Sequence, residues 1–209
     1  MIRHIYIVRH GNTFDKGDTV TRVGARTDLA LSNSGKGQAA ALGNHFADAA
    51  IQFDRILSSP LQRTHQTARA ICGRQSGQAD IEFCEFLREI DYGPDENRPE
   101  PEVIARIGEQ ALSNWEEKAL VPKGWRVDPA AIKQAWADCF ASLTPSEAQN
   151  GPVLIVTSNG IARFALQLAE GEQRSQAPLK LATGAIGRID ITENGELSVN
   201  FWNQRPEIR

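Results

Sequence analysis

Apolar residues along the chain form short runs, rich in β-branched side chains, that are separated by longer segments with helical spacing. A short apolar run bounded by turn residues is typical of a buried strand. Four runs fit this description: residues 2–8, 53–58, 81–86 and 153–157. The last run passes through Ser158-Asn159-Gly160 into another helical segment. Helices that alternate with strands in this way predict a mostly parallel sheet that is covered on both faces.

Helix signals follow the first two strands. Residues 31–50 predict one helix, with Ser32 or Ser34 as its N-cap, because a serine oxygen accepts a hydrogen bond from a free backbone N–H of the first turn. Residues 60–76 predict a second helix that is capped by Ser59 and has a proline at its first position.

The middle of the chain has a different character. Residues 91–101 are rich in Pro, Asp and Glu, and amphipathic helical stretches follow at about 102–120 and 129–143. We interpret residues 91–150 as a helical insertion over the sheet rather than as a separate domain. The insertion carries Trp115, Trp125 and Trp136. These side chains are expected to pack helices onto the sheet rather than to stack on a ligand.

The chain ends in a hairpin signal. Residues 185–192 and 196–202 flank Asn194-Gly195, a dipeptide typical of a type I′ turn between antiparallel strands. The whole pattern predicts an α/β fold with three layers (α/β/α), a mostly parallel central sheet, a C-terminal antiparallel hairpin and a helical insertion.

Composition narrows the class of protein. Hydrophobic residues make up 41% and charged residues 23% of the 209 residues, and the formal net charge is -3 without a basic block. Nucleic acid is therefore not expected as a partner, and an anion site must be built locally from a few arginines.

The cysteines and the N-terminal residues indicate in which cellular compartment the protein is expected. Cys72, Cys84 and Cys139 are odd in number and lack C-x-x-C spacing, so we expect free thiols and a reducing compartment. The apolar run 2–8 is too short for a signal peptide, and no run has the length of a membrane span. A cytoplasmic protein without a membrane partner is expected.

Residues suited to anion chemistry follow the predicted strands. The first strand ends in Arg9-His10, and Glu89 comes just past the strand at 81–86. Arg63 lies in the first turn of the second helix, where unpaired backbone N–H groups favour an anion. Its planar guanidinium also suits phosphate oxygens.

Four motifs occur in a fixed order. They are RHGNT at 9–13, GARTDLALSNSGKGQA at 24–39, SSPLQRTHQTA at 58–68 and LREIDYG at 87–93. Together they resemble the histidine phosphatase superfamily, also called the phosphoglycerate mutase-like family, over nearly the whole chain. The resemblance implies one phosphoglycerate mutase-like domain over residues 1–209, since agreement at several levels is specific where one motif is not.

The resemblance also implies roles. His10 would be the nucleophile, Arg9 and Arg63 would hold phosphate oxygens, and Thr13 would add a hydroxyl contact. Glu89 would protonate the leaving alcohol and then take a proton from water. These roles suit phosphoryl transfer, because a neutral imidazole divides one transfer into two steps and fixed positive charge stabilises the transferring group. Such chemistry needs neither a metal nor a cofactor.

The last parallel strand departs from the family pattern. The family reads roughly Val-x-His-Gly-Gly there, and Ser158 stands in the place of the second catalytic histidine. No later residue replaces it, since the last histidine is His65. Losing one preorganised donor costs on the order of 10²–10³ in rate. Ser158 and Asn159 are expected to donate weaker hydrogen bonds to the phosphate.

Alternative functions follow from this departure. The first is a phosphomonoester phosphatase that acts through a phosphohistidine on a small phosphorylated substrate and is weakened at Ser158. The second is a binding or regulatory protein for a phosphoryl ligand that has lost efficient catalysis. A phosphoglycerate mutase-type phosphotransferase is a third, without a specific signature. In each, the partner is a small phosphate ester or inorganic phosphate. The insertion, with Arg98 and Arg106, is expected to cover the pocket, and Lys16 either contacts substrate or is solvated.

Overall fold

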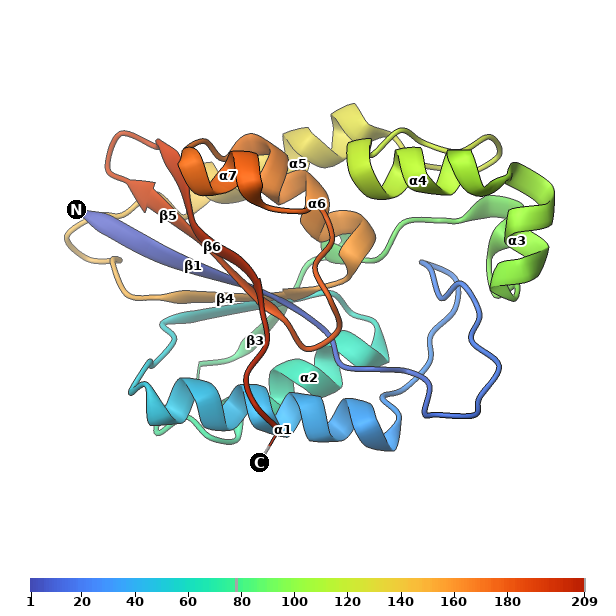
Figure 1. Cartoon of the computed structure of the whole chain (residues 1–209). Helices are drawn as coiled ribbons and strands as arrows, with labels where there is room; N and C mark the ends of the chain where they lie inside the picture. The colour runs from blue at the N-terminus through green and yellow to red at the C-terminus, as the bar shows by residue number, and fades with distance from the viewer. Residues whose placement is uncertain (78, 209) are drawn as a thin grey trace.

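A six-stranded sheet with the order β3-β2-β4-β1-β5-β6 is the middle layer of the computed structural model, which describes residues 1–77 and 79–208 (Figure 1). The strands are β1 (Ile2–Arg9), β2 (Arg55–Ser58), β3 (Ile81–Phe83), β4 (Val153–Thr157), β5 (Ile186–Thr192) and β6 (Leu197–Gln204). The pairs β1–β4, β4–β2 and β2–β3 are parallel, whereas β5 is antiparallel to β1 and to β6. The predicted α/β fold, with its mostly parallel sheet and antiparallel hairpin, is confirmed.

Helices cover both faces of this sheet. In the described ranges they are α1 (Asn33–Asp48), α2 (Gln62–Cys72), α3 (Glu100–Ile107), α4 (Glu109–Lys118), α5 (Pro129–Ser142), α6 (Asn159–Leu168) and α7 (Glu172–Gln176), with 3₁₀ turns at Glu85–Leu87 and Gly93–Asp95. Figure 1 shows α1 and α2 on one face, and α5, α6 and α7 on the other. The two outer layers and the sheet give the predicted three-layer architecture.

The alternation of side chains in β1 explains why both faces are covered. Ile5 and Ile7 belong to the core on the α5–α6 side, whereas Tyr6 and Val8 belong to the core on the α1–α2 side. A strand that is apolar on both faces must be buried on both, as in most parallel sheets. Strand β4 is buried along its whole length for the same reason.

One of the two helix starts predicted from the sequence is correct and the other is not. Ser32 caps α1, with its Oγ accepting from the Gly35 N–H at 3.2 Å. The predicted start of the second helix at Pro60 is wrong, because α2 begins at Gln62. The Ser59 N–H donates to the Val156 carbonyl and so extends the pairing with β4, which delays the helix by two residues.

The helices of the predicted insertion lie in two different parts of the fold. The predicted helix over 102–120 is two helices that meet at Gly108, where φ is 81°. Helix α5 packs on α6, and the Trp136 Nε1–H donates to the Ile161 carbonyl at 3.0 Å. Trp115, Trp125 and Trp136 are all buried in the core, as predicted. Helix α5 therefore belongs to the layer over the sheet, and only α3 and α4 lie beyond it (Figure 1).

The C-terminal hairpin has a different turn from the one predicted. Strands β5 and β6 pair as expected, but φ is positive at Gly195 (79°) and not at Asn194. The Gly195 N–H donates to the Thr192 carbonyl, and the Thr192 N–H donates to the Glu196 carbonyl. This is a three-residue loop that ends in a left-handed glycine, so the type I′ prediction is wrong.

Cys72, Cys84 and Cys139 are free thiols, as predicted. Within the described residues, no helix combines the length and the apolar character needed to cross a bilayer.

Candidate active site

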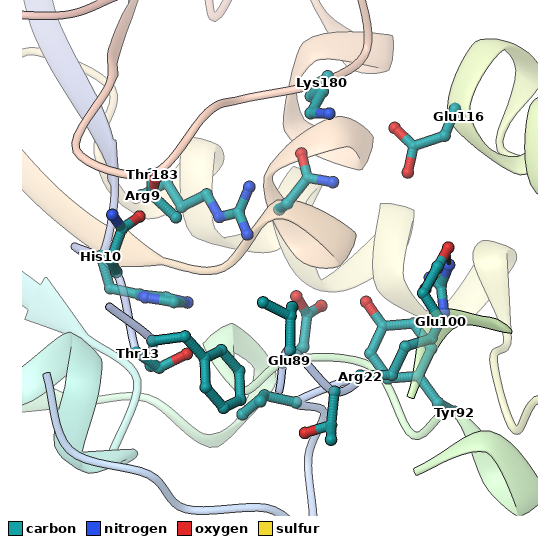
Figure 2. Close-up of a pocket in the computed structure, with 16 residues that line it drawn as sticks. Arg9, His10, Thr13, Arg22, Glu89, Tyr92, Glu100, Glu116, Lys180 and Thr183 are labelled. Carbon is teal, nitrogen blue, oxygen red and sulfur yellow. Dashed lines mark hydrogen bonds and ion pairs between the residues drawn. The ribbon is translucent and has the colours of Figure 1, made fainter. Parts of the chain in front are cut away.

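A cavity of about 510 Å³ opens where β1 and β4 end, and Figure 2 shows the side chains that line it. Of the site residues predicted from the sequence, those that line the cavity are Arg9, His10, Thr13, Glu89 and Asn159. The others, Arg63 and Ser158, are fully buried and do not line it.

His10 directly follows β1, and its backbone N–H donates to the Thr157 carbonyl of β4 at 3.1 Å. The side chain is 5% exposed. Its Nδ1 lies 2.7 Å from the Gly11 carbonyl oxygen, which can only accept a hydrogen bond. Nδ1 therefore carries the proton, and Nε2 keeps the lone pair that a nucleophile needs.

The surroundings keep this imidazole neutral. Burial lowers the pKa of His10 well below its usual value, and the guanidinium groups of Arg63 and Arg9 lower it further. The hydrogen bond with Gly11 acts in the opposite direction but is the weakest of these effects. A neutral imidazole is the form that can attack phosphorus.

Arg63 is held in place from three sides. Its Nε donates to His10 Nε2 at 3.2 Å, and its terminal nitrogens donate to the carbonyls of Thr27 at 2.8 Å and Gly24 at 3.1 Å. It lies in the first turn of α2, as predicted. The guanidinium is thus oriented before any ligand arrives, which is how preorganised charge stabilises a transition state.

Leu181 orients two polar side chains at once. Its carbonyl accepts from Arg9 at 3.0 Å, and its N–H donates to Asn159 Oδ1 at 2.8 Å. The Leu181 N–H needs an acceptor, so the Asn159 oxygen Oδ1 faces it. The Asn159 amide nitrogen then has no partner among the described residues. Since Asn159 lines the cavity, this nitrogen can donate to a ligand there. In the described structure Arg9 donates through one terminal nitrogen and its Nε is buried without a partner, so the other terminal nitrogen is the group available to a ligand in the cavity.

Glu89 is fixed by two backbone N–H groups. Its Oε1 accepts from the Ile90 N–H at 2.9 Å and its Oε2 from the Gly160 N–H at 3.2 Å. The side chain is 5% exposed and lines the cavity, facing it from the side opposite Arg9 in Figure 2. The carboxyl group can therefore exchange a proton with a group inside the cavity.

Ser158 directly follows β4, as the sequence predicted, but its hydroxyl does not face the cavity. It is the N-cap of α6, and its Oγ is buried without a hydrogen-bond partner in the described structure. The hydroxyl does not line the cavity, whereas the next side chain, Asn159, does. The predicted contact between Ser158 and a phosphate is thus not present in this geometry.

A sequence model described as the histidine phosphatase superfamily (branch 1) matches residues 5–205. The chain belongs to the histidine phosphatase superfamily. The four sequence motifs that resemble this superfamily all lie within the matched range.

Two named proteins resemble this chain over most of its length. The mitochondrial serine/threonine-protein phosphatase Pgam5 of Drosophila pseudoobscura pseudoobscura is 24% identical over 201 residues, or 95% of this chain. The chain spans only 62% of that relative's length. The 2,3-bisphosphoglycerate-dependent phosphoglycerate mutase of Bartonella bacilliformis is 26% identical over 189 residues, which cover 88% of this chain and 90% of the mutase.

Solved structures of other proteins share the fold of this chain. A mycobacterial glucosyl-3-phosphoglycerate phosphatase in complex with inorganic phosphate aligns with a TM-score of 0.75 at 20% identity, covering 99% of this chain and 100% of that one. A phosphoglycerate mutase from Bacillus anthracis aligns with a TM-score of 0.79 at 18% identity, covering 97% and 93%. At this identity the likeness establishes the fold alone.

Several residues that line the cavity carry no sequence motif. They include Arg22, Glu100, Glu116, Lys180 and Thr183. The Arg22 guanidinium lies over the rings of Tyr92 and Trp125, at 5.4 and 5.1 Å from their centroids, and forms an ion pair with Glu100 at 2.5 Å. These partners are far apart in sequence, so no local pattern could have predicted them.

Other expected contacts are absent from the cavity. Arg106 pairs with Asp95, and Arg98 pairs with Glu102 at 3.5 Å, so neither insertion arginine reaches this site. Lys16 is exposed and does not line the cavity, which supports the solvated alternative. Among the residues that the structure describes, no group of His, Cys, Asp or Glu could hold a metal ion.

Gly160 allows Glu89 to approach the start of α6. A Cβ at position 160 would overlap Glu89 Oε1 and lie 2.9 Å from Ile90 Cγ1. Alanine normally stabilises a helix relative to glycine by about 1 kcal/mol, but overpacking costs about 1–3 kcal/mol. We therefore expect Gly160→Ala to destabilise the protein and to lower activity by displacing Glu89.

The control for this variant is Gly37→Ala in α1, where nothing lies within 4 Å of an added Cβ. This change should stabilise the protein by about 0.5–1 kcal/mol. Urea unfolding of both variants measures the two effects. Equal stabilisation of both would show that Gly160 is not required for the approach of Glu89.

The buried imidazole should also make stability depend on pH. Because the folded-state pKa of His10 is depressed, the unfolded chain takes up a proton below about pH 6.5 that the folded chain does not. Stability should then fall with decreasing pH by up to about 1.4 kcal/mol per unit, beginning near pH 6.5 and continuing down to the folded-state pKa. In His10→Gln this slope should be shallower. Urea unfolding across this range, without phosphate, measures it, and identical slopes would contradict the buried neutral state.

Proposed function

We propose that this chain is a phosphomonoester phosphatase that acts through a phosphohistidine at His10. The observation that carries the proposal is the geometry of His10. Its Nδ1–H is tied to the Gly11 carbonyl, and its Nε2 lone pair lies beside the fixed guanidinium of Arg63. Membership of the superfamily and its phosphatase relatives support the same reaction class.

In the proposed first step, the phosphate enters the cavity and its oxygens replace His10 Nε2 as the acceptor of the Arg63 Nε–H. The Nε2 lone pair forms a bond to phosphorus while the bond from phosphorus to the alcohol oxygen breaks. Protonated Glu89 gives its proton to the leaving alcohol. Arg9 and Arg63 stabilise the negative charge that spreads over the phosphoryl oxygens.

In the proposed second step, ionised Glu89 removes a proton from water. The water oxygen bonds to phosphorus as the bond from phosphorus to Nε2 breaks. Inorganic phosphate leaves, and His10 returns to its neutral form with its Nδ1 proton unchanged. Glu89 ends the cycle protonated, so each group is regenerated.

A second candidate function rests on Ser158. If no other group replaces the donor expected at this strand end, the site would bind phosphate esters through Arg9 and Arg63 without efficient turnover. In that case the protein would be a binding or regulatory protein for a phosphoryl ligand.

Phosphate release from a panel of phosphomonoesters between about pH 5 and 8 tests the proposal. A phosphatase should turn over at least one ester at about 1–10³ per second. Thermal stabilisation of the protein by inorganic phosphate, measured in parallel, reports binding without catalysis. Stabilisation by phosphate without turnover of any ester would favour the binding protein.

A further inference from the structure

The cavity has opposite charges at its two ends. The His10 end has the guanidinium groups of Arg9 and Arg63, which suit a phosphate. The far wall carries two carboxylates of the insertion, Glu100 and Glu116, as Figure 2 shows. A volume of about 510 Å³ lies in the range of small-molecule sites and leaves room for the alcohol part of an ester.

The two carboxylates differ in how they are neutralised. Glu100 forms its ion pair with Arg22. Glu116 has no hydrogen bond or ion pair within the described part of the chain, although its side chain is partly buried and faces the cavity. A partly buried carboxylate with no cation in direct contact can gain from a cationic ligand that pairs with it.

A rigid support holds Glu116 in this position. The preceding residue, Trp115, is 1% exposed, and its carbonyl accepts from Arg163 at 2.5 Å. The Arg163 guanidinium also lies 4.1 Å from the centroid of the Trp115 indole. Helix α4 is thereby fixed to α6 next to Asn159, so Glu116 has a defined position relative to the phosphate end.

Nearby cations do not neutralise Glu116 by direct contact. Burial lowers the pKa of both Arg163 and Arg9, and Glu116 is one of the charges that oppose this effect. Both guanidiniums, however, donate to backbone carbonyls instead. Lys180 is exposed at the same mouth of the cavity and forms no ion pair with Glu116 in the described structure. An exposed lysine on a loop is a weak competitor for a partly buried carboxylate.

We propose that Glu116 is a subsite for a cation, and that the substrate is a small phosphomonoester whose alcohol part carries an ammonium or a similar positive group. This inference rests on the proposed function, since it places the phosphate at His10. The phosphate and the cation of such an ester would each meet opposite charge. An ester with a carboxylate in place of the cation would be repelled by Glu116, which is a form of selection against competitors.

A graded series of ω-aminoalkyl phosphates, compared with alkyl and ω-carboxyalkyl phosphates of equal length, tests the subsite. At the best length we expect kcat/KM to favour the amine over the alkyl ester by about tenfold. Glu116→Gln should abolish this preference, so that amine and alkyl esters of equal length are hydrolysed with similar kcat/KM. Glu117→Gln is the matched control, because it removes a charge from the next, exposed position of α4 and should keep the preference.

The outcomes separate this inference from the proposed function. Turnover without an amine preference, or with a preference for the carboxylate ester, would overturn the subsite and leave the phosphatase intact. If no ester is hydrolysed, thermal stabilisation by the same esters replaces kcat/KM. A greater stabilisation by the amine that Glu116→Gln removes would then support the subsite while the phosphatase fails, and equal stabilisation would overturn both.

Discussion

Replacing His10 with alanine is expected to lower turnover of every phosphomonoester by about 10⁴-fold or more, to the background of the assay. The effect should be this large because His10 Nε2 is the protein atom that forms a bond to phosphorus in the proposed mechanism, and removal of a nucleophile costs about 10⁴–10⁶ in other enzymes. Phosphate release with an activated ester, such as an aryl phosphate, gives the widest range for this measurement.

The same experiment can detect the intermediate. In Glu89→Gln, transfer to His10 should still occur with an aryl phosphate, whose leaving group needs no proton, while hydrolysis of the phosphohistidine slows because no base activates water. Labelled phosphate should therefore accumulate on this variant, be released by acid, and be absent when His10 is also replaced. Wild-type turnover in a folded His10→Ala, or a label that resists acid, would refute the phosphohistidine.

The fold was predictable where local patterns determine it. The runs that became β1, β2 and β4 each have a continuous apolar stretch that is buried between the two helical layers, and Ser32 caps α1 through a contact within its own turn. The predictions that were wrong concern positions where distant segments compete. Hydrogen bonding of Ser59 to β4 delays α2, and the geometry of β5 and β6 selects a three-residue turn instead of type I′.

The candidate site was predictable only in part, for a related reason. His10 and Arg63 belong to motifs whose spacing places them at the same edge of the sheet, and the structure brings them together. The roles of these residues remain proposals. Glu116 and Arg22 reach the cavity from segments without any motif, so only the folded chain reveals them. The insertion arginines failed as candidates because each found a carboxylate within the insertion.

Replacing Asn159 with aspartate is expected to lower kcat/KM by about 10²–10³, the cost of losing one preorganised donor. In this variant one carboxylate oxygen can still accept from the Leu181 N–H, as Asn159 Oδ1 does at 2.8 Å. The other oxygen replaces the free amide nitrogen and presents negative charge to the phosphate. The protein should remain stable, because the new carboxylate lies near Arg9, which Leu181 also holds.

Ser158→Ala tests which side chain at the start of α6 supplies a donor to the phosphate. The Ser158 hydroxyl is buried, has no partner in the described structure and does not line the cavity, so its removal should change kcat/KM by less than about threefold. Stability should be unchanged or raised by about 1 kcal/mol, since an unsatisfied buried hydroxyl is lost. A large loss in Asn159→Asp with little change in Ser158→Ala would assign the second donor to the asparagine amide. The reverse would mean that Ser158 turns into the cavity when phosphate binds, and that the amide nitrogen of Asn159 is not the replacement.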